Sequence, residues 1–131
     1  MSSSVDKFMD NSKHLKEIVR NDEELNLYDV VNNIDRKKMP VYSGCLKYFP
    51  NALKYVSFVS YMGNQQHHAD KPLHWDKSKS SDESDALVRH LIDHSINPLD
   101  EDGLYHLGKV AWRSLALLER YLENEQLQEK N

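Results

Sequence analysis

Basic side chains recur along one face of the helix that the sequence predicts near its C-terminal end. At about 100° per residue, His106, Lys109, Arg113 and Arg120 fall on one narrow stripe opposite a row of leucines. Lysine and arginine side chains arranged in this way can bind phosphate oxygens, although a solvent-exposed charged face is the commoner outcome for a stripe taken alone. The stripe is therefore a candidate anion site in a chain whose net charge is -4.

Acidic side chains share the polar face of the preceding predicted helix. Asp82 and Asp85 are three residues apart, and Asp93 lies two turns further on. Arg89 has the spacing to pair with Asp85 or with Asp93, and such pairs can be purely structural. Two or three carboxylates on one helical face could instead hold Mg²⁺, which prefers oxygen ligands.

Histidines and a tryptophan gather where the helical period is lost. We interpret residues 64–79 as a long loop, and it contains His67, His68, His74 and Trp75. Imidazoles there could contact phosphate, and Trp75 could stack on a base. An indole that fills the edge of the core is an equally good interpretation of Trp75.

A metal site built from histidine or cysteine is not favoured by the spacing alone. His90 and His94 have the i,i+4 spacing of two zinc ligands, but the glutamate of the H-E-x-x-H motif is missing. Both lie on the flank of an apolar face, where histidines beside a core are commoner than ligands. Cys45 is the only cysteine, which excludes an intramolecular disulfide and a thiolate zinc site and favours a buried or unreactive thiol.

The elements that must position these residues are predicted to be helices. Short apolar stripes over 15–19 and 27–34 indicate two N-terminal helices, of which the second ends before Pro40. Residues 41–45 contain Gly44 and are expected to form a turn or a short extended segment. A third helix is predicted to begin at Pro50, which suits a first helical turn, and to end at Gly63.

Two more helices follow the predicted loop. Ser80 and Glu83 have the spacing of a capping box, and the helix that they open is expected to end at Asn97-Pro98. Asp100 and Asp102 then precede the last helix, where capping is their expected role. That helix, over 104–122, is apolar around more than half of its circumference, so we expect it to be central to the core or to an oligomer interface.

Length and composition limit the class of protein. The 131 residues predict one all-α domain, a compact bundle of four or five helices that forms a homo-oligomer. We divide it into an N-terminal helical segment (1–45), a core (46–120) and a polar C-terminal tail (121–131). The acidic balance argues against nonspecific nucleic-acid binding, and no signal peptide or membrane span is visible, so we expect a cytoplasmic protein. Walker A, Rossmann and nucleophile-elbow motifs are absent.

Five short motifs occur in an order that resembles a known family. They are Tyr61-x-Gly63-Asn64, Pro72-Leu73-His74-Trp75-Asp76, Asp85-Ala86-Leu87-Val88-Arg89-His90-Leu91, Asp102-Gly103-Leu104-x-His106, and Ala111-Trp112-Arg113-x-Leu115-Ala116-Leu117-Leu118. Over roughly residues 46–120 the chain resembles small phage-encoded helical proteins labelled dATP/dGTP diphosphohydrolase N-terminal-like. More distantly it is similar to anti-CBASS sponge proteins, helical oligomers that capture cyclic nucleotide immune messengers without cleaving them.

Two departures bear on what the resemblance implies. The family's Lys-Tyr-Gly is Ser60-Tyr61-Met62-Gly63 in this chain, and the candidate helices lack the Glu-x-x-Glu pair with which MazG-type pyrophosphohydrolases bind Mg²⁺. The resemblance therefore implies nucleotide binding better than it implies hydrolysis.

The sequence leaves two functions open, besides a helical module that binds a protein partner. The first is a phage or prophage sponge that binds a nucleotide or cyclic nucleotide with no cofactor. Its candidate ligand-binding residues are Tyr61, Asn64, His74, Trp75, Lys77, Lys79, Arg89, His90, His106, Lys109 and Arg113. The second is a Mg²⁺-dependent dATP/dGTP diphosphohydrolase, in which Asp82, Asp85 and Asp102 hold the metal.

Overall fold

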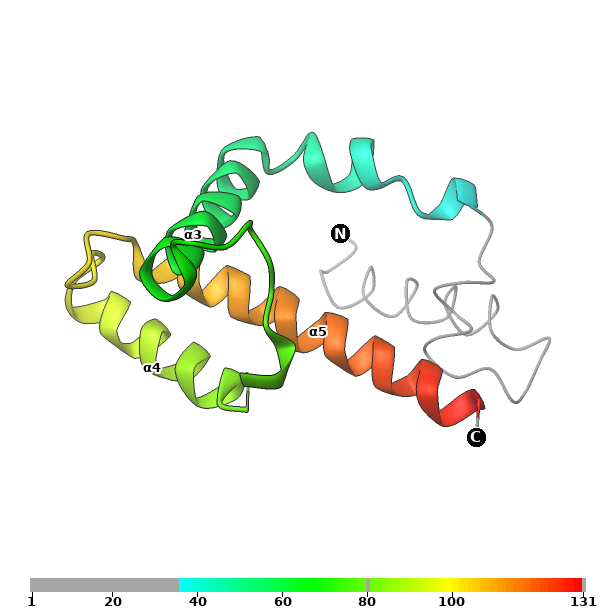
Figure 1. The fold of residues 1–131 in the computed structure, drawn as a ribbon. Coiled ribbons are helices and arrows are strands. Elements are labelled where there is room, and N and C mark those ends of the chain that lie inside the picture. The colour runs from blue at the N-terminus through cyan, green and yellow to red at the C-terminus, as the bar shows by residue number, and fades with distance from the viewer. Residues whose placement is uncertain (1–35, 80, 131) are drawn as a thin grey trace, which may run out of the picture. The chain divides into compact units, whose positions relative to one another are not determined.

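The computed structural model describes residues 36–79 and 81–130, and all regular structure in them is helical (Figure 1). The predicted all-α class is confirmed. The helices predicted over 15–19 and 27–34 lie outside the described residues. Contacts divide the chain into two units, Val41–Tyr121 and a second made of residues 1–40 with 122–131. Every predicted site residue belongs to the unit Val41–Tyr121.

The elements follow one another in a simple order. They are η1 (Arg36–Lys38), η2 (Tyr42–Leu46), α3 (Pro50–His68), η3 (Lys77–Lys79), α4 (Glu83–Ile96) and α5 (His106–Lys130). No helix in the described part of the chain is both long and apolar enough to span a membrane.

The segment before α3 differs from the prediction. Residues 41–45 were expected to form a turn or an extended segment, which is wrong, because Tyr42–Leu46 is a short π-helix. The backbone N–H of Lys47 closes it by donating to the carbonyl of Tyr42 over 2.8 Å. A glycine costs only about 1 kcal/mol in a helix, so Gly44 alone does not exclude one. Cys45 lies exposed in this element.

Helix α3 begins where the sequence predicts and ends later. Pro50 is its first residue, as expected. The predicted stop at Gly63 is wrong, because the helix continues to His68 and the loop that follows is correspondingly shorter. The side chain of Asn64 accounts for the observed end: it is buried, and its amide Nδ2 donates to the carbonyls of His68 at 3.4 Å and Lys71 at 3.1 Å.

Helix α4 ends as predicted but begins differently. Asp82 occupies the N-cap position without a side-chain capping bond, and Ser80 lies outside the described residues. The capping role predicted for Glu83 is wrong, because its carboxylate is buried and hydrogen-bonded to Arg113. At the other end Asn97 is extended, as a residue before proline prefers, and the helix stops there.

A tight loop joins α4 to α5. Leu99 and Tyr105 form an isolated antiparallel bridge, and Gly103 takes a positive φ of 81°, which glycine adopts without strain. The Oδ1 atoms of Asp100 and Asp102 accept the backbone N–H groups of Glu101 and Leu104, at 2.7 and 3.0 Å. The two aspartates thus hold the loop itself, and α5 runs on as far as Lys130, through most of the predicted polar tail.

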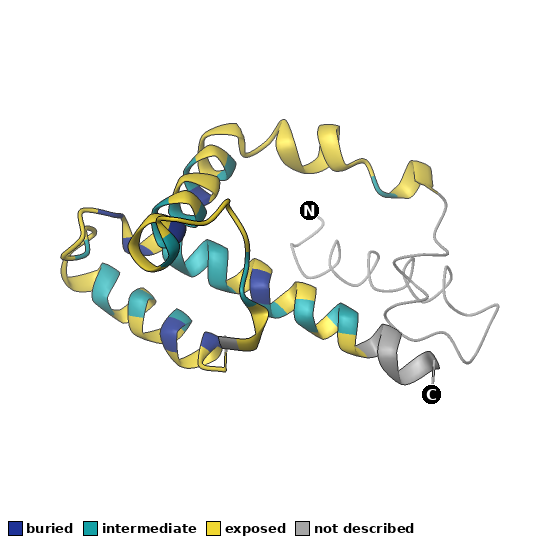
Figure 2. Ribbon diagram, viewed as in Figure 1, coloured by how far each residue is buried: buried dark blue, intermediate teal, exposed yellow. Residues whose placement is uncertain are grey.

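Helix α5 packs against α3 and α4, and a small core lies among the three helices (Figure 2). Arg113 of α5 meets Glu83 of α4, whereas His106 meets His90, so the two helices run antiparallel. Gly108 of α5 lies against Tyr55 of α3. The buried apolar residues among those described are Val56, Ala86, Leu104 and Ala116.

The face that α5 turns inward is the basic stripe. His106 and Ala116 are 5% and 4% exposed, whereas Leu107, Leu115 and Leu118 are 47–55% exposed. In this unit the leucine row is therefore not the core face of the helix.

Candidate functional site

Two cations of the basic stripe, Lys109 and Arg113, are largely shielded from solvent. The side chain of Lys109 is 17% exposed and that of Arg113 is 30% exposed. At these two positions the stripe is therefore not a freely solvated charged face. Helix α5 presents both residues on the side that faces α4 and the loop before α5, because the two lie one helical turn apart.

Two aspartates hold the ammonium group of Lys109. Its Nζ donates to Oδ2 of Asp100 and Oδ2 of Asp102, each over 2.6 Å. The hydrogen bond from Lys109 is the chief cause of the lowered pKa of Asp100. Burial alone would raise the pKa of Asp102 and lower that of Lys109. The shared hydrogen bonds outweigh burial, so the pKa of Asp102 is lowered and that of Lys109 is raised.

Arg113 forms a second ion pair, with the first turn of α4. Its Nη1 donates to Oε2 of Glu83 over 2.9 Å and lies 4.0 Å from Oδ1 of Asp82. Glu83 is only 3% exposed, and its other oxygen, Oε1, has no hydrogen-bond partner in the described residues. The guanidinium also lies 5.8 Å from the ring of Trp112. Arg113 thereby joins a buried carboxylate to an aromatic wall.

Two histidines and a carboxylate converge beside Lys109. The Nδ1 atoms of His90 and His106 are 3.0 Å apart, a hydrogen bond in which one of the two rings carries the proton. Oδ2 of Asp100 lies 3.8 Å from Nδ1 of His90 and 3.9 Å from Nδ1 of His106. Burial, with a contribution from the charge of Lys109, lowers the pKa of His90.

These residues border a charged cavity of about 240 Å³. It is lined by Val59, Gln66, His67, His90, Asp102, Leu104, Lys109, Trp112 and Arg113. Gln66, from the last turns of α3, donates to Asp102 over 3.3 Å and so links that helix to the charged group. The cavity therefore draws walls from α3, α4, α5 and the loop before α5.

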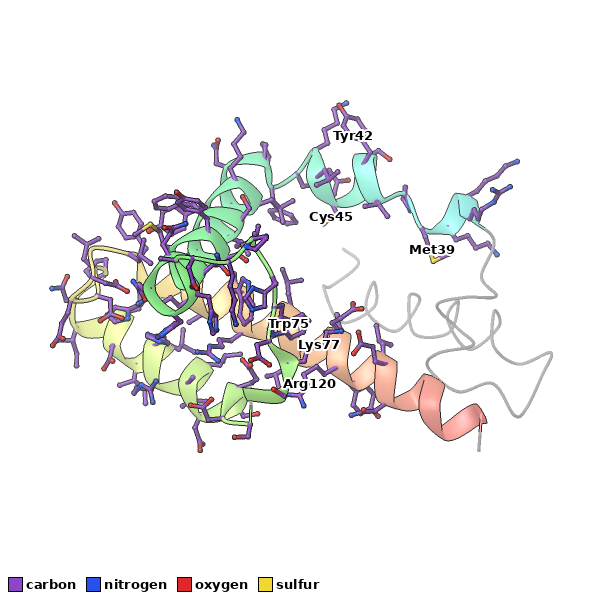
Figure 3. The ribbon with its side chains drawn as sticks, viewed as in Figure 1. Met39, Tyr42, Cys45, Trp75, Lys77 and Arg120 are labelled. Atoms are coloured by element: carbon purple, nitrogen blue, oxygen red, sulfur yellow. The ribbon has the colours of Figure 1, made fainter. Side chains whose placement is uncertain are left out.

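A second, more aromatic cavity of about 320 Å³ shares a wall with the first. It is lined by Ser60, Gly63, Asn64, His67, His68, His74, Trp75, Asp76 and Trp112, so His67 and Trp112 belong to both cavities. The rings of Trp75 and Trp112 meet edge to face at 5.6 Å, and Lys77 lies 4.9 Å over Trp75 (Figure 3). We call the two cavities together the bipartite cleft.

The cleft collects most, but not all, of the ligand-binding residues predicted from sequence. Asn64, His74 and Trp75 line its aromatic part, and His90, Lys109 and Arg113 line its charged part. Lys77 reaches it through Trp75, and His106 is buried behind His90.

Three other predicted ligand residues lie elsewhere or are not described. Tyr61 is half exposed and stacks on Phe58, and Arg89 is exposed on α4; neither is among the residues that line the cleft. The side chain of Lys79 lies outside the described part of the structure.

The three carboxylates considered for Mg²⁺ are not brought together. Asp82 and Asp85 are exposed at the start of α4, whereas Asp102 is bonded to Lys109. Among the described residues one group of three ligand-type side chains converges, and it consists of His90, Asp100 and His106. A set of oxygen ligands suited to Mg²⁺ is therefore not formed by Asp82, Asp85 and Asp102.

Some residues in or beside the cleft were not predicted from the sequence as ligand-binding residues. Gln66 and Trp112 line the cleft, whereas Asp100 and Glu83 lie beside it and bond its cations Lys109 and Arg113. The sequence did contain a signal for Asp100. An acidic residue directly before a helix can pair with a lysine on the inward face of that helix. Glu83 gave no comparable signal, since its partner is thirty residues away.

The fold and the cleft define a class: a helical domain with adjoining charged and aromatic cavities. The chain belongs to the family described as dATP/dGTP diphosphohydrolase, N-terminal, whose model matches residues 32–130. Searches of curated proteins and of solved structures found no match.

Proposed function

We propose that the chain binds a purine nucleotide in the bipartite cleft, with phosphates in the charged part and the base in the aromatic part. The observation that carries the proposal is that the two cavities share His67 and Trp112 as walls. A nucleotide is a ligand of this form, since a charged chain is joined to a flat ring. Each cavity is near the lower end, about 300 Å³, of the range for small-molecule sites, so together they suit a ligand of this size.

The charged part offers donors held in place before any ligand arrives. Lys109 and Arg113 are fixed by carboxylates, so little side-chain freedom remains to be lost when they contact phosphate. The same carboxylates, Asp100, Asp102 and Glu83, outnumber the two cations. We therefore expect a nucleotide to bind better with its usual Mg²⁺ counter-ion, which offsets the repulsion between phosphate and carboxylate.

The aromatic part offers ring faces and edges. Trp75 and Trp112 form one corner, and His68 and His74 another, with their ring centroids 4.9 Å apart. Stacking on an aromatic side chain stabilises a bound base by about 1–3 kcal/mol. Replacing Trp75 by alanine should therefore weaken base selection with little change in salt dependence.

We propose further that the nucleotide is held intact, as in a phage or prophage sponge that withdraws a nucleotide immune signal. The support is chemical: Asp102 is bonded to Lys109 and Glu83 to Arg113, so these two carboxylates are engaged with cations. Metal-assisted hydrolysis needs carboxylates that are available to a metal and its water.

Calorimetry with dATP, dGTP and cyclic dinucleotides, with and without Mg²⁺, tests the proposal. Lys109→Ala should weaken binding by about 1.5–3 kcal/mol, the range for hydrogen bonds to charged groups. Lys54→Ala is the matched control, because Lys54 is an exposed cation of α3 that does not line the cleft. If Lys109→Ala and Arg113→Ala bind every tested nucleotide as the wild type does, the cleft is not the site.

The second candidate function is dATP/dGTP diphosphohydrolase activity, and family membership favours it. Heating the complex and chromatographing the released ligand separates the two functions, since a sponge returns intact nucleotide. Release of pyrophosphate that depends on Mg²⁺ and is abolished by Asp85→Asn would establish the enzyme instead.

A further inference from the structure

We propose that His90, Asp100 and His106 form a binding site for a divalent transition-metal ion of the zinc class. This site is separate from the predicted carboxylate set and from the His90/His94 spacing considered in the sequence. It requires no nucleotide, so it stands or falls independently of the proposed function.

The spacing of the three donor atoms suits one ion. Zinc lies about 2.0–2.2 Å from imidazole nitrogen and carboxylate oxygen, so two ligands in a tetrahedral site are about 3.3–3.6 Å apart. The observed separations are 3.0 Å between the two Nδ1 atoms and 3.8 and 3.9 Å from these to Oδ2 of Asp100. Shifts of a few tenths of an ångström would bring all three atoms to ideal separations.

The three ligands come from three different elements: α4, the loop before α5, and α5. His90 lies within α4, and His106 is the first residue of α5, where its N–H donates to the carbonyl of Pro98 over 3.0 Å. Asp100 is held by the N–H of Glu101 at one oxygen and by Lys109 at the other. Hydrogen bonds to a ligating carboxylate, such as those that Asp100 accepts, orient the ligand in natural metal sites.

Donor type and charge select the class of ion. Two imidazoles and one carboxylate match zinc and neighbouring transition metals, whereas Mg²⁺ and Ca²⁺ prefer oxygen alone. Asp100 and Asp102 offset the positive charges of Lys109 and Arg89 near the cluster, so the cation meets no net positive charge there. Because His90 also lines the charged cavity, a fourth ligand can reach the ion from the cleft.

Titration of the chelator-treated protein with Zn²⁺ alone tests the proposal. We expect uptake of one ion per chain, measured by calorimetry and by metal analysis after dialysis. Loss of a residue that hydrogen-bonds to a metal ligand lowers metal affinity about 10–100-fold. We expect a larger loss of zinc affinity from each of His90→Gln, His106→Gln and Asp100→Asn, because each substitution removes a ligand itself. His94→Gln is the matched control, one turn along the same helix and outside the cluster.

Imidazole nitrogen NMR of the wild-type protein gives a readout that does not depend on whether a variant folds. Zn²⁺ should shift the Nδ1 resonances of His90 and His106 and leave those of His94 in place. The proposal is overturned if the wild type takes up no stoichiometric zinc, if only other histidines shift, or if His94→Gln abolishes uptake while the folded cluster variants retain it.

Discussion

The ion pair between Arg113 and Glu83 makes a prediction about stability as well as binding. Removing Arg113 leaves a carboxylate that is 3% exposed without its cation. Breaking a fully buried pair costs about 3–5 kcal/mol, and because the Arg113 side chain is 30% exposed we expect about 2 kcal/mol for Arg113→Ala. Urea unfolding followed by circular dichroism measures this loss.

The double variant Glu83→Gln/Arg113→Ala is the control for that explanation. It removes both charges, so it should regain a large part of the stability that Arg113→Ala loses. If the effects of the two substitutions simply add, the pair is not coupled and the loss has another origin.

At the level of single residues, the sequence predicted which cations matter but not what they contact. Lys109 and Arg113 were recognisable because helical spacing places them on one stripe. Their partners could not be read in this way, since Glu83 is thirty residues from Arg113 and the pairing depends on how α4 and α5 pack. The cluster of His90, His106 and Asp100 also depends on how these helices pack, so it could not be read from the sequence. Spacing along the chain offered His94 as the partner of His90.

Two glycines in helices allow opposite predictions for the same substitution. A Cβ on Gly63 of α3 would meet no atom within 4 Å, so Gly63→Ala should stabilise the protein by about 0.5–1 kcal/mol through helix propensity. A Cβ on Gly108 of α5 would lie 2.5 Å from Cε1 of Tyr55. Tyr55 cannot turn away freely, because its hydroxyl accepts the backbone N–H of Tyr105 over 2.7 Å.

Gly108→Ala should therefore destabilise the protein by about 1–3 kcal/mol, as overpacking does. Thermal unfolding of the two variants side by side checks both signs. Equal shifts for the two would contradict the close approach of α3 and α5 at Gly108.

The helices themselves were largely predictable, and their errors share a physical cause. Pro50 and Asn97-Pro98 mark boundaries correctly because proline restricts the backbone directly. Gly63 misled the prediction because a glycine costs a helix only about 1 kcal/mol, which packing and the Asn64 hydrogen bonds can offset. Glu83 misled it because its carboxylate is buried and pairs with Arg113 in place of a capping bond.

For the whole molecule, the homo-oligomer stays a prediction, and the exposed leucine row of α5 is the surface at which we expect its interface. Leu107, Leu115 and Leu118 are each about half exposed, and Tyr121 continues the row at 52%. A contiguous apolar strip of this kind is typical of a surface that another molecule covers. We therefore expect light scattering at micromolar concentration to report a mass above that of one chain.

Substitutions in the same row decide whether it forms the interface. Leu115→Glu/Leu118→Glu should lower the mass to that of a monomer, because two carboxylates per chain would be buried without partners at the interface. Leu115→Met/Leu118→Met should keep the oligomer, since it preserves apolar surface and approximate volume. Because these side chains are exposed, their replacement should leave the unit folded. Far-ultraviolet circular dichroism checks that both variants keep their helices. A wild-type mass equal to one chain, or an oligomer that survives the glutamates, would contradict an interface at this row.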